Sequence, residues 1–321
     1  VDLAALANVP AGARSLARTV ERIHLEQAEA RRHGPQLRAN LEANVEALIG
    51  ATSLHACTGV AAGRPGFVLA AGPSAAAAMS WLGDARRHGP IVAVDTALPL
   101  CRSAGIPVDC LVAVDPHPAS AVHLSHGVAD VGALAFQPYC APAIVDAFPS
   151  RVLALPRGDR LCDRAARLMD LPSVPVAGTV LLYALQVAAV LGCDPIVIVG
   201  ADFAHVGGHS HAIGTATSRE LAPTGLVVAD AHGQPVPTSH ALLRFLAEVE
   251  RHIAATRAHH VVVDGGGAAI AGARRASPTA IARWLAMRAP AARAPFVVPA
   301  VGSAAIPLRR RVWSTLLGQF D

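Results

Sequence analysis

The chain has 321 residues, of which 53% are hydrophobic and 16% charged, and its formal net charge is +4. This composition excludes a disordered chain and predicts an extensive core, in one large α/β domain or in two smaller ones. The chain contains no lysine, so every basic residue is arginine, which excludes a Walker-type phosphate loop and a Schiff-base enzyme. Phosphate charge must therefore be met by arginine, backbone amides, helix N-termini or a metal.

The cysteines do not indicate a zinc ribbon, and the basic residues do not indicate a nucleic-acid site. Six cysteines are scattered without a Cys-x-x-Cys pair, so we expect small buried side chains and not zinc ligands or disulfides. The basic run Arg309–Arg311 has no interleaved aromatic residues, which favours a solvated tail over contact with nucleic acid. No signal-peptide pattern is present at the N-terminus, and we expect a cytoplasmic protein.

The N-terminal region is helical in pattern from about residue 11 to residue 49. Leu37, Leu41, Val45 and Leu48 recur at helical spacing and share one face. We expect one long helix, or a helical hairpin broken near Gly34-Pro35. These helices either pack on the core or bind a partner, which includes a second copy of the chain in a homo-oligomer.

From Phe67 onward, short apolar runs alternate with helical stretches. The predicted strands are 67–71, 91–94, 111–114, 133–137, 152–155, 196–199 and 261–263. The predicted helices are 75–87, 97–103, 180–191, 239–256 and 279–287. This alternation predicts an α/β fold with a doubly wound, mainly parallel Rossmann-like sheet and an N-terminal helical extension. We expect a helical region over 1–60, a nucleotide-binding transferase domain over 61–275, and a C-terminal helix and tail over 276–321.

One uncharged stretch, 171–193, is long enough to cross a bilayer. However, Pro172, Pro175 and Gly178 break its first part, and it leads directly into the strand-like run 196–199. The sequence therefore favours a buried loop–helix–strand unit over a membrane span.

Small and acidic residues follow three of the predicted strands. Gly72-Pro73-Ser74, Asp95-Thr96 and Asp115 come directly after buried apolar runs. In open α/β sheets, ligands bind beyond the carboxyl ends of the strands, so these residues predict a nucleotide-type site. The two carboxylates suit a ribose, a divalent cation or the polarisation of a nucleophile. The competing interpretations are a tight turn at Gly72 and helix capping by the aspartates.

Two further segments have the residue types of a binding or catalytic site. Gly178 and Thr179 precede a predicted helix, where they form either a second phosphate or sugar cradle or a simple N-cap. The segment 200–211 holds Asp202, a Gly207-Gly208 turn and three histidines. Histidine serves as a general base near neutral pH, and the spacing also allows zinc, although no cysteine or glutamate joins it nearby. The alternative is that the segment 200–211 is a solvated polar loop without a role in binding or catalysis.

In order and spacing, these segments resemble the 6-hydroxymethylpterin diphosphokinase (MptE-like) family, whose domain is shared with the bacterial Maf motility-associated-factor glycosyltransferases. The resemblance extends over most of residues 37–275. The segments that carry it are Leu37–Val45, Gly72–Ser74, Val94–Ala97, Gly105–Asp109, Val114–Pro116, Gly178–Val180, Gly200–Ala204, Gly207–Gly208 with His211, and Asp264 with Gly266–Ala268.

The resemblance implies a transferase that uses a nucleotide-activated donor. The Maf branch, which Val114–Pro116 and His211 resemble more closely, implies transfer of a nonulosonic acid from a CMP donor to a protein or small-molecule acceptor. The other branch implies an ATP-dependent diphosphokinase with magnesium, which Asp95 and Asp115 would hold. A non-catalytic nucleotide-binding scaffold remains the third alternative. For sugar transfer we expect His211 as general base, with His232 and Asp202 as further catalytic candidates.

Overall fold

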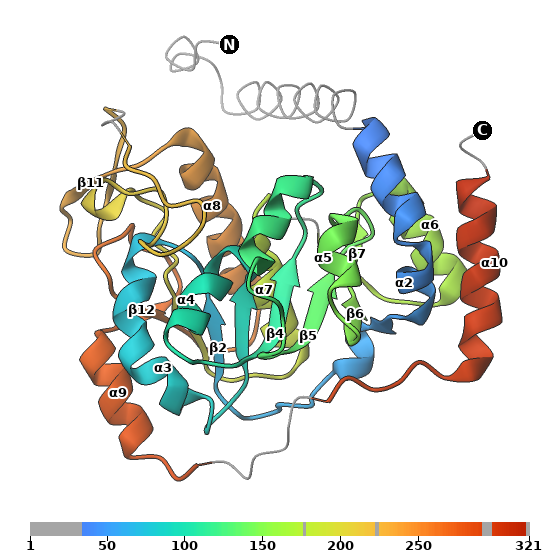
Figure 1. Ribbon diagram of the computed structural model, residues 1–321. Helices are drawn as coiled ribbons and strands as arrows, with labels where there is room; N and C mark the ends of the chain where they lie inside the picture. Colours follow the sequence, from blue (N-terminus) through green and yellow to red (C-terminus); the bar gives the residue numbers. More distant parts are fainter. Residues whose placement is uncertain (1–33, 176–177, 222–224, 291–296, 319–321) are drawn as a thin grey trace.

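The computed structural model describes residues 34–175, 178–221, 225–290 and 297–318 and has a large parallel sheet at its centre (Figure 1). Nine strands follow one another in the order β1-β6-β5-β4-β3-β2-β9-β12-β13, and each neighbouring pair is parallel. The strands are β1 Thr52–Ser53, β2 Gly66–Leu69, β3 Ile91–Val94, β4 Val108–Ala113, β5 Val131–Phe136, β6 Arg151–Leu153, β9 Ile196–Val199, β12 His260–Val263 and β13 Arg274–Ala276. The predicted doubly wound α/β class is confirmed.

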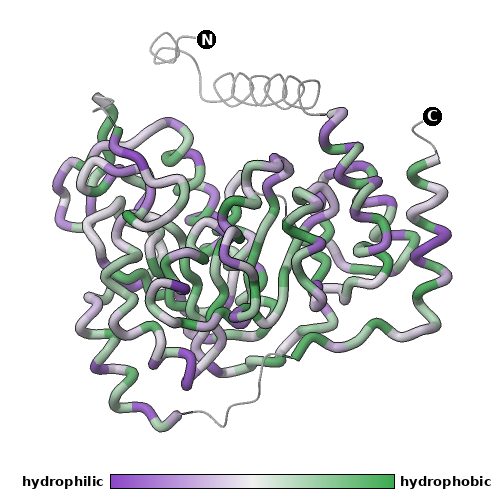
Figure 2. The backbone as a smooth tube through the Cα atoms, in the orientation of Figure 1, coloured by the Kyte–Doolittle hydropathy of each residue, from purple (hydrophilic) through white to green (hydrophobic). Residues whose placement is uncertain are grey.

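The central strands form because they are short runs of apolar residues that can be buried on both faces. Every residue of β2, β3, β4 and β9 is buried. Such strands are typical of a parallel sheet covered by helices on both sides. Figure 2 shows the hydrophobic segments concentrated in the middle of the molecule, where these strands lie.

Helices cover both faces of this sheet. Helices α3 (Met79–Ala85) and α4 (Leu98–Ser103) lie in front of it in Figure 1, and α7 (Val180–Val190) lies behind, against β2, β3 and β4. Helix α8 (His240–Ala255) packs beside α7, and α9 (Pro278–Ala286) packs beside α3. Helices α5 (Pro142–Asp146) and α6 (Arg160–Met169) follow β5 and β7.

Several predicted helices begin as short 3₁₀ segments. The stretch predicted as helix 75–87 is η3 (Pro73–Ala78) followed by α3, and η4 (Asp95–Ala97) precedes α4. The remaining 3₁₀ segments are η2 Leu54–Cys57, η5 Pro118–Leu124, η6 Val206–Gly208 and η7 Ser303–Ala305. Proline at the start of η3 and η5 fixes the backbone angle at the turn from strand to helix.

The uncharged stretch 171–193 is a buried unit inside the domain. It contains β8 (Ser173–Pro175), which pairs with β7 (Leu155–Arg157), and the eleven-residue helix α7, of which residues 181–188 are buried. In the described part of the chain, no helix is long and apolar enough to cross a membrane. The predicted loop–helix–strand arrangement is confirmed.

The C-terminal segment is folded, which corrects the expectation of a solvated tail at Arg309–Arg311. Helix α10 (Ile306–Leu317) packs against α2 (Val45–Gly50) and α6 at the right of Figure 1. The Arg309 guanidinium is buried and donates hydrogen bonds to the carbonyl oxygens of Ile49 and Ala51. Long-range packing places this arginine, and nothing in its local sequence distinguishes it from its neighbours.

The remaining expectations concern the N-terminal region and the cysteines. Residues 34–43 are helical, and the earlier part of the predicted N-terminal helix lies outside the described residues. All six cysteines are buried thiols, as predicted. The segment 205–234 contains η6 and contributes β10 (Val227–Ala229), which pairs with β11 (Pro235–Pro237) in a hairpin.

Candidate functional site

The order of strands reverses between β2 and β9, and this reversal is where a ligand crevice is expected. From β2 the chain adds β3, β4, β5 and β6 on one side, then returns to place β9 on the other side. In open α/β sheets, ligands bind beyond the carboxyl ends of the strands at such a switch point. Here the structure brings Ser74 and Asp202 together: Ser74 donates its backbone N–H to Asp202 Oδ2 over 2.8 Å and its hydroxyl to Asp202 Oδ1.

Glycines make this junction because the chain segments approach one another very closely. Gly72 donates its N–H to the Gly200 carbonyl over 2.9 Å, and a Cβ at Gly72 would lie 2.3 Å from that same oxygen. A Cβ at Gly265 would lie 2.0 Å from Ser74 Cβ. A side chain at Gly72 or Gly265 is therefore excluded by the close approach of these segments, and ligand binding at Gly72 stays a prediction.

Asp95 lies at the end of β3 as a buried carboxylate. Its side chain is 4% exposed, and its Oδ1 accepts hydrogen bonds from the N–H of Thr96 over 2.8 Å and from the Thr96 hydroxyl over 3.3 Å. Burial raises the pKa of the Asp95 carboxyl to about 6, although the hydrogen bonds from Thr96 lower it. The charge of Asp115 also raises it. The structure thus brings the two predicted aspartates together.

Asp115 lies at the end of β4 and is exposed. Its Oδ1 accepts a hydrogen bond from the N–H of His117 over 2.7 Å, and its carbonyl accepts one from Ala141 over 3.0 Å. These bonds fix the backbone on both sides of the carboxylate. Asp115 is therefore held in place beyond the end of β4 with its side chain exposed to solvent, and its charge acts on the buried Asp95.

Two asparagines that sequence reasoning did not select hold these loops in place. Asn40 donates to the carbonyls of Pro116 and Tyr139 over 2.8 and 2.9 Å. Asn44 donates to those of Pro138 and Cys140 over 3.0 and 2.8 Å. Both side chains are buried. The spacing of four residues puts them on one helix face, and that spacing was the signal available in the sequence.

His211 lies near the end of β2, on a loop that hydrogen bonds hold in place. Ala212, the next residue, donates its N–H to the carbonyl of Ala71 over 2.9 Å, and Ser218 donates its hydroxyl to the His211 carbonyl over 2.9 Å. Burial lowers the pKa of the His211 imidazole. A hydrogen bond to the backbone of Thr217 raises it by less, and the charge of Arg219 lowers it further. The imidazole is therefore neutral near pH 7, the state that a general base requires.

A second histidine, which sequence reasoning missed, joins His211. His123 lies in η5 and is 6% exposed. Burial lowers its pKa, His211 lowers it further, and Asp115 opposes the shift, so the three groups lie within electrostatic reach of one another. The surrounding run of small and apolar residues gave no sign that this histidine lies near Asp115 and His211.

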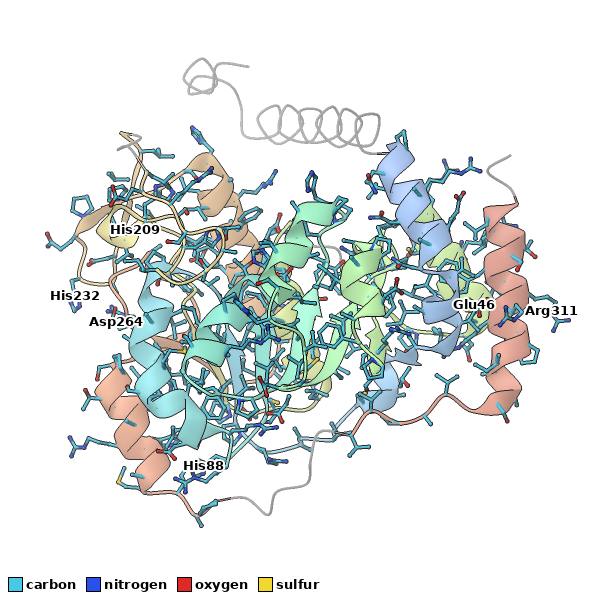
Figure 3. All side chains as sticks on the ribbon, in the orientation of Figure 1. Glu46, His88, His209, His232, Asp264 and Arg311 are labelled. Atoms are coloured by element: carbon cyan, nitrogen blue, oxygen red, sulfur yellow. The ribbon has the colours of Figure 1, made fainter. Side chains whose placement is uncertain are left out.

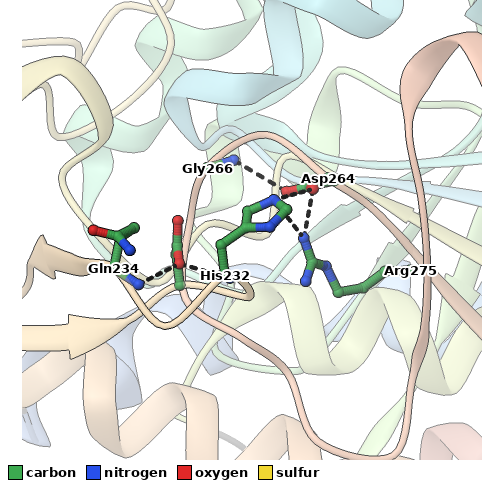
Figure 4. A network of polar contacts seen from close by, with 6 residues as sticks. His232, Gln234, Asp264, Gly266 and Arg275 are labelled. Atoms are coloured by element: carbon green, nitrogen blue, oxygen red, sulfur yellow. Dashed lines mark hydrogen bonds and ion pairs between the residues drawn. The ribbon is translucent and has the colours of Figure 1, made fainter.

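His232 lies apart from this cluster, at the turn of the β10–β11 hairpin (Figure 4). Its Nε2 is 3.7 Å from Asp264 Oδ2 and 3.5 Å from the guanidinium of Arg275, which donates to the same carboxylate over 2.5 Å. A small hollow beside this network is lined by Asp202, Asp264, Gly265, Gly267 and Arg275. Figure 3 shows His232 and Asp264 at one end of the molecule, opposite Glu46 and Arg311.

The second predicted cradle, Gly178-Thr179, immediately precedes α7. The N–H of Gly178 donates to Glu248 Oε2 over 3.0 Å, and the side chain of Thr179 makes no capping bond. In the first turns of α7, the hydroxyl of Tyr183 is 3.2 Å from Gln137 Oε1, which places this helix start near the end of β5. A phosphate at this position would have to displace the Glu248 carboxylate from the Gly178 amide.

The donor atoms of Asp95 and Asp115 fit magnesium better than zinc. Magnesium is held through one or two carboxylates together with water and substrate phosphates, and a cation between these aspartates would relieve their mutual repulsion. Within the ranges that the structure describes, no three His, Cys, Asp or Glu side chains converge as metal ligands, and the histidines of 205–211 form no such group.

The raised pKa of Asp95 predicts a pH-dependent stability. A carboxyl whose folded pKa of about 6 exceeds its ordinary value of 3.8 binds its proton more tightly in the folded state. The protonated Asp95 carboxyl therefore contributes to the unfolding free energy at low pH. This contribution is lost as the pH rises through about 6. We compare the unfolding free energy of Asp95→Asn with that of the wild type in buffer containing a chelator. Between about pH 4 and pH 7, the difference should change by about 2 to 3 kcal/mol in favour of the variant.

Urea titrations at several pH values check this expectation, because the wild type and the variant share every other titrating group. A constant difference between the two proteins over this range would show that Asp95 titrates at its ordinary pKa in the folded state.

Comparisons with known proteins connect this geometry to a family. No curated protein matches the chain significantly by sequence. Among solved structures, the Maf glycosyltransferase from Magnetospirillum magneticum AMB-1 is similar in fold, with a TM-score of 0.61 and 15% sequence identity. The match covers 89% of this chain and 45% of that protein, so the chain spans less than half of the length of this neighbour.

A family model described as 6-hydroxymethylpterin diphosphokinase MptE-like matches residues 36–208, which is more than half of the chain. The matched region includes the two asparagines of the N-terminal helix, the ends of β2, β3, β4 and β9, and the loop that leads to His211. On this match, the chain belongs to the 6-hydroxymethylpterin diphosphokinase MptE-like family.

Proposed function

We propose that the chain is a transferase that binds a nucleotide-activated donor at the carboxyl ends of β2, β3, β4 and β9. More narrowly, we propose a Maf-like glycosyltransferase with a CMP-nonulosonic acid type of donor. The observation that carries the proposal is the placement of three candidate groups at one edge of the sheet: Asp95 follows β3, Asp115 follows the neighbouring parallel strand β4, and the loop of His211 is hydrogen-bonded through Ala212 to Ala71 just beyond β2. Family membership and the fold of the Magnetospirillum enzyme support it.

The chemistry of these groups suits sugar transfer. An acceptor hydroxyl must lose its proton as its oxygen bonds to the anomeric carbon and the bond from that carbon to the phosphate oxygen breaks. The electron pair of the broken bond leaves with the nucleotide, and the proton passes to His211, which is neutral because burial lowers its pKa. Asp202 would hold the end of β2 through Ser74 and would act as a positioning residue.

The second candidate is an ATP-dependent diphosphokinase, which a different observation favours. Asp95 and Asp115 fit a magnesium ion, and if the enzyme is magnesium-dependent these two carboxylates would hold it. The ion would neutralise charge on the transferred phosphates. A non-catalytic scaffold that binds nucleotide is the third candidate, because family membership does not require activity.

Binding calorimetry with CMP, CDP, UDP, GDP, ATP and AMP, each with and without magnesium, separates these candidates. We expect metal-independent binding with preference for CMP. Magnesium-dependent binding of ATP would favour the diphosphokinase, and no binding of any of these nucleotides at millimolar concentration would contradict the proposal. Donor hydrolysis by the wild type that Asp115→Ala abolishes would rule against the scaffold.

A further inference from the structure

Three successive carbonyl groups around Asp115 accept hydrogen bonds from three different parts of the chain. Gln137 Nε2 donates to the carbonyl of Val114 over 3.0 Å, and the N–H of Ala141 donates to the carbonyl of Asp115 over 3.0 Å. The carbonyl of the following residue accepts from the side chain of Asn40. Each bond holds one peptide group, so the backbone on both sides of the Asp115 carboxylate has little freedom to rotate.

Asn40 connects the loop of Asp115 to a second loop. Its Nδ2 donates to the carbonyl of Pro116 over 2.8 Å and to the carbonyl of Tyr139 over 2.9 Å, and its Oδ1 accepts from Gln36 Nε2 over 2.7 Å. Both N–H donors of the amide are thus used, and the side chain is 2% exposed. The two loops follow the neighbouring strands β4 and β5, so Asn40 fixes the ends of these strands relative to each other.

One oxygen of the Asp115 carboxylate stays open in this fixed loop. Oδ1 accepts the N–H of His117 over 2.7 Å, and the side chain is exposed to solvent. No donor among the described residues engages Oδ2. A carboxylate oxygen contributes to binding when a ligand hydroxyl or a cation meets it at bonding distance, and a displacement of about 0.5 Å already weakens such a contact. The geometry of the loop therefore decides how well Asp115 can serve the donor.

We propose that Asn40 is a positioning residue of the site, which sets the direction of the Asp115 carboxylate by holding the carbonyl of Pro116. The inference deepens the proposed function and rests on it for the role of Asp115. Asn44, four residues further along the same helical segment, provides the contrast. It is equally buried and also donates to two carbonyls, but both of them belong to residues 138–140 in the loop after β5. Only Asn40 reaches the peptide group that follows Asp115.

A double-mutant cycle separates positioning from general support of the fold. Asn40→Leu removes the two donors at similar volume, Asp115→Ala removes the carboxylate, and calorimetry measures the affinity for CMP. We expect Asn40→Leu to weaken CMP binding about tenfold when Asp115 is present and by less than about twofold in the Asp115→Ala background. An equal loss in both backgrounds, or unchanged CMP affinity in Asp115→Ala alone, would overturn the inference while CMP binding by the wild type left the proposed function standing.

Asn44→Leu is the matched control, because it removes the same two donors from the same helical segment. Urea unfolding should show that both variants lose stability, whereas only Asn40→Leu should depend on the Asp115 carboxylate in its effect on CMP affinity. Equal coupling of both variants to Asp115 would overturn the assignment to Asn40. If Asn40→Leu does not fold, Asn40→Ser replaces it in the cycle, because the smaller side chain leaves room for water to reach the two carbonyls.

A measurement without nucleotide keeps the two proposals separable. The amide proton of His117 reports on the Asp115 carboxylate, because it donates to Oδ1 over 2.7 Å. Its NMR resonance should move upfield in Asn40→Leu, as this bond weakens, and should stay in place in Asn44→Leu. An unmoved resonance in Asn40→Leu would overturn the inference even if the wild type binds CMP. A moved resonance in a protein that binds no nucleotide would support positioning by Asn40 and contradict the proposed function.

Discussion

Replacing His211 with alanine is expected to lower turnover by about 10²–10⁴-fold and to leave donor affinity almost unchanged. This range is the usual contribution of a general base that removes a proton in the transition state. Burial lowers the pKa of the His211 imidazole, so the side chain is neutral and adds little to the binding of an anionic donor. The loss should therefore appear in kcat with little change in the donor Kd.

Two matched histidine variants make this result interpretable. His126→Ala, at an exposed position, should keep wild-type turnover. His232→Ala should also keep it, because His232 lies with Asp264 and Arg275 at the far side of the switch point. Near-normal turnover of His211→Ala would move the catalytic role to His232 or Asp202. Loss of nucleotide binding in His211→Ala would instead make His211 a binding residue.

The sequence predicted the central strands well, because parallel strands that are buried on both faces are continuous runs of apolar residues. It did not predict the edge strands β1 and β13, which are two and three residues long. The bounds of β3 and β9 agree with the predicted 91–94 and 196–199, and the start of α7 agrees with the predicted helix. The polar residues at these strand ends could be selected for the same reason, since topology places the ends of parallel strands along one edge. Whether they bind nucleotide stays a prediction.

The parts that sequence reasoning missed depend on contacts between distant segments. Asn40 and Asn44 contact carbonyl oxygens of residues 99 and 96 positions away in the sequence. No residue near either asparagine in the sequence indicates those partners. His123 comes close to Asp115 and His211 because long-range packing brings η5 and the loop of His211 together. Arg309 is buried because α10 returns to α2. Hydrophobic periodicity carries no information on such contacts, so a buried arginine and a solvated one look alike in sequence.

Gly72→Ala is expected to lower the unfolding free energy by about 3 to 5 kcal/mol, because overpacking against backbone cannot relax through a side-chain rotamer. The added methyl group would lie 2.3 Å from the Gly200 carbonyl oxygen and 2.6 Å from Asp202 Oδ2. The backbone of Gly72 is extended, with φ of −62°, so alanine meets no conformational penalty there and the effect reports on packing alone. To admit the methyl group, the ends of β2 and β9 must separate.

Gly83→Ala is the matched control, since it adds the same methyl group inside α3, where the nearest atom is Ile106 Cγ1 at 3.7 Å. That variant should be more stable than the wild type by about 0.5 to 1 kcal/mol, because alanine restricts the unfolded chain. Urea unfolding measures both changes. If Gly72→Ala stays within about 1 kcal/mol of the wild type, the ends of β2 and β9 are not held at this spacing. Separation of the two strand ends would also break the bonds from Ser74 to Asp202, so the destabilised protein should lose donor affinity together with stability.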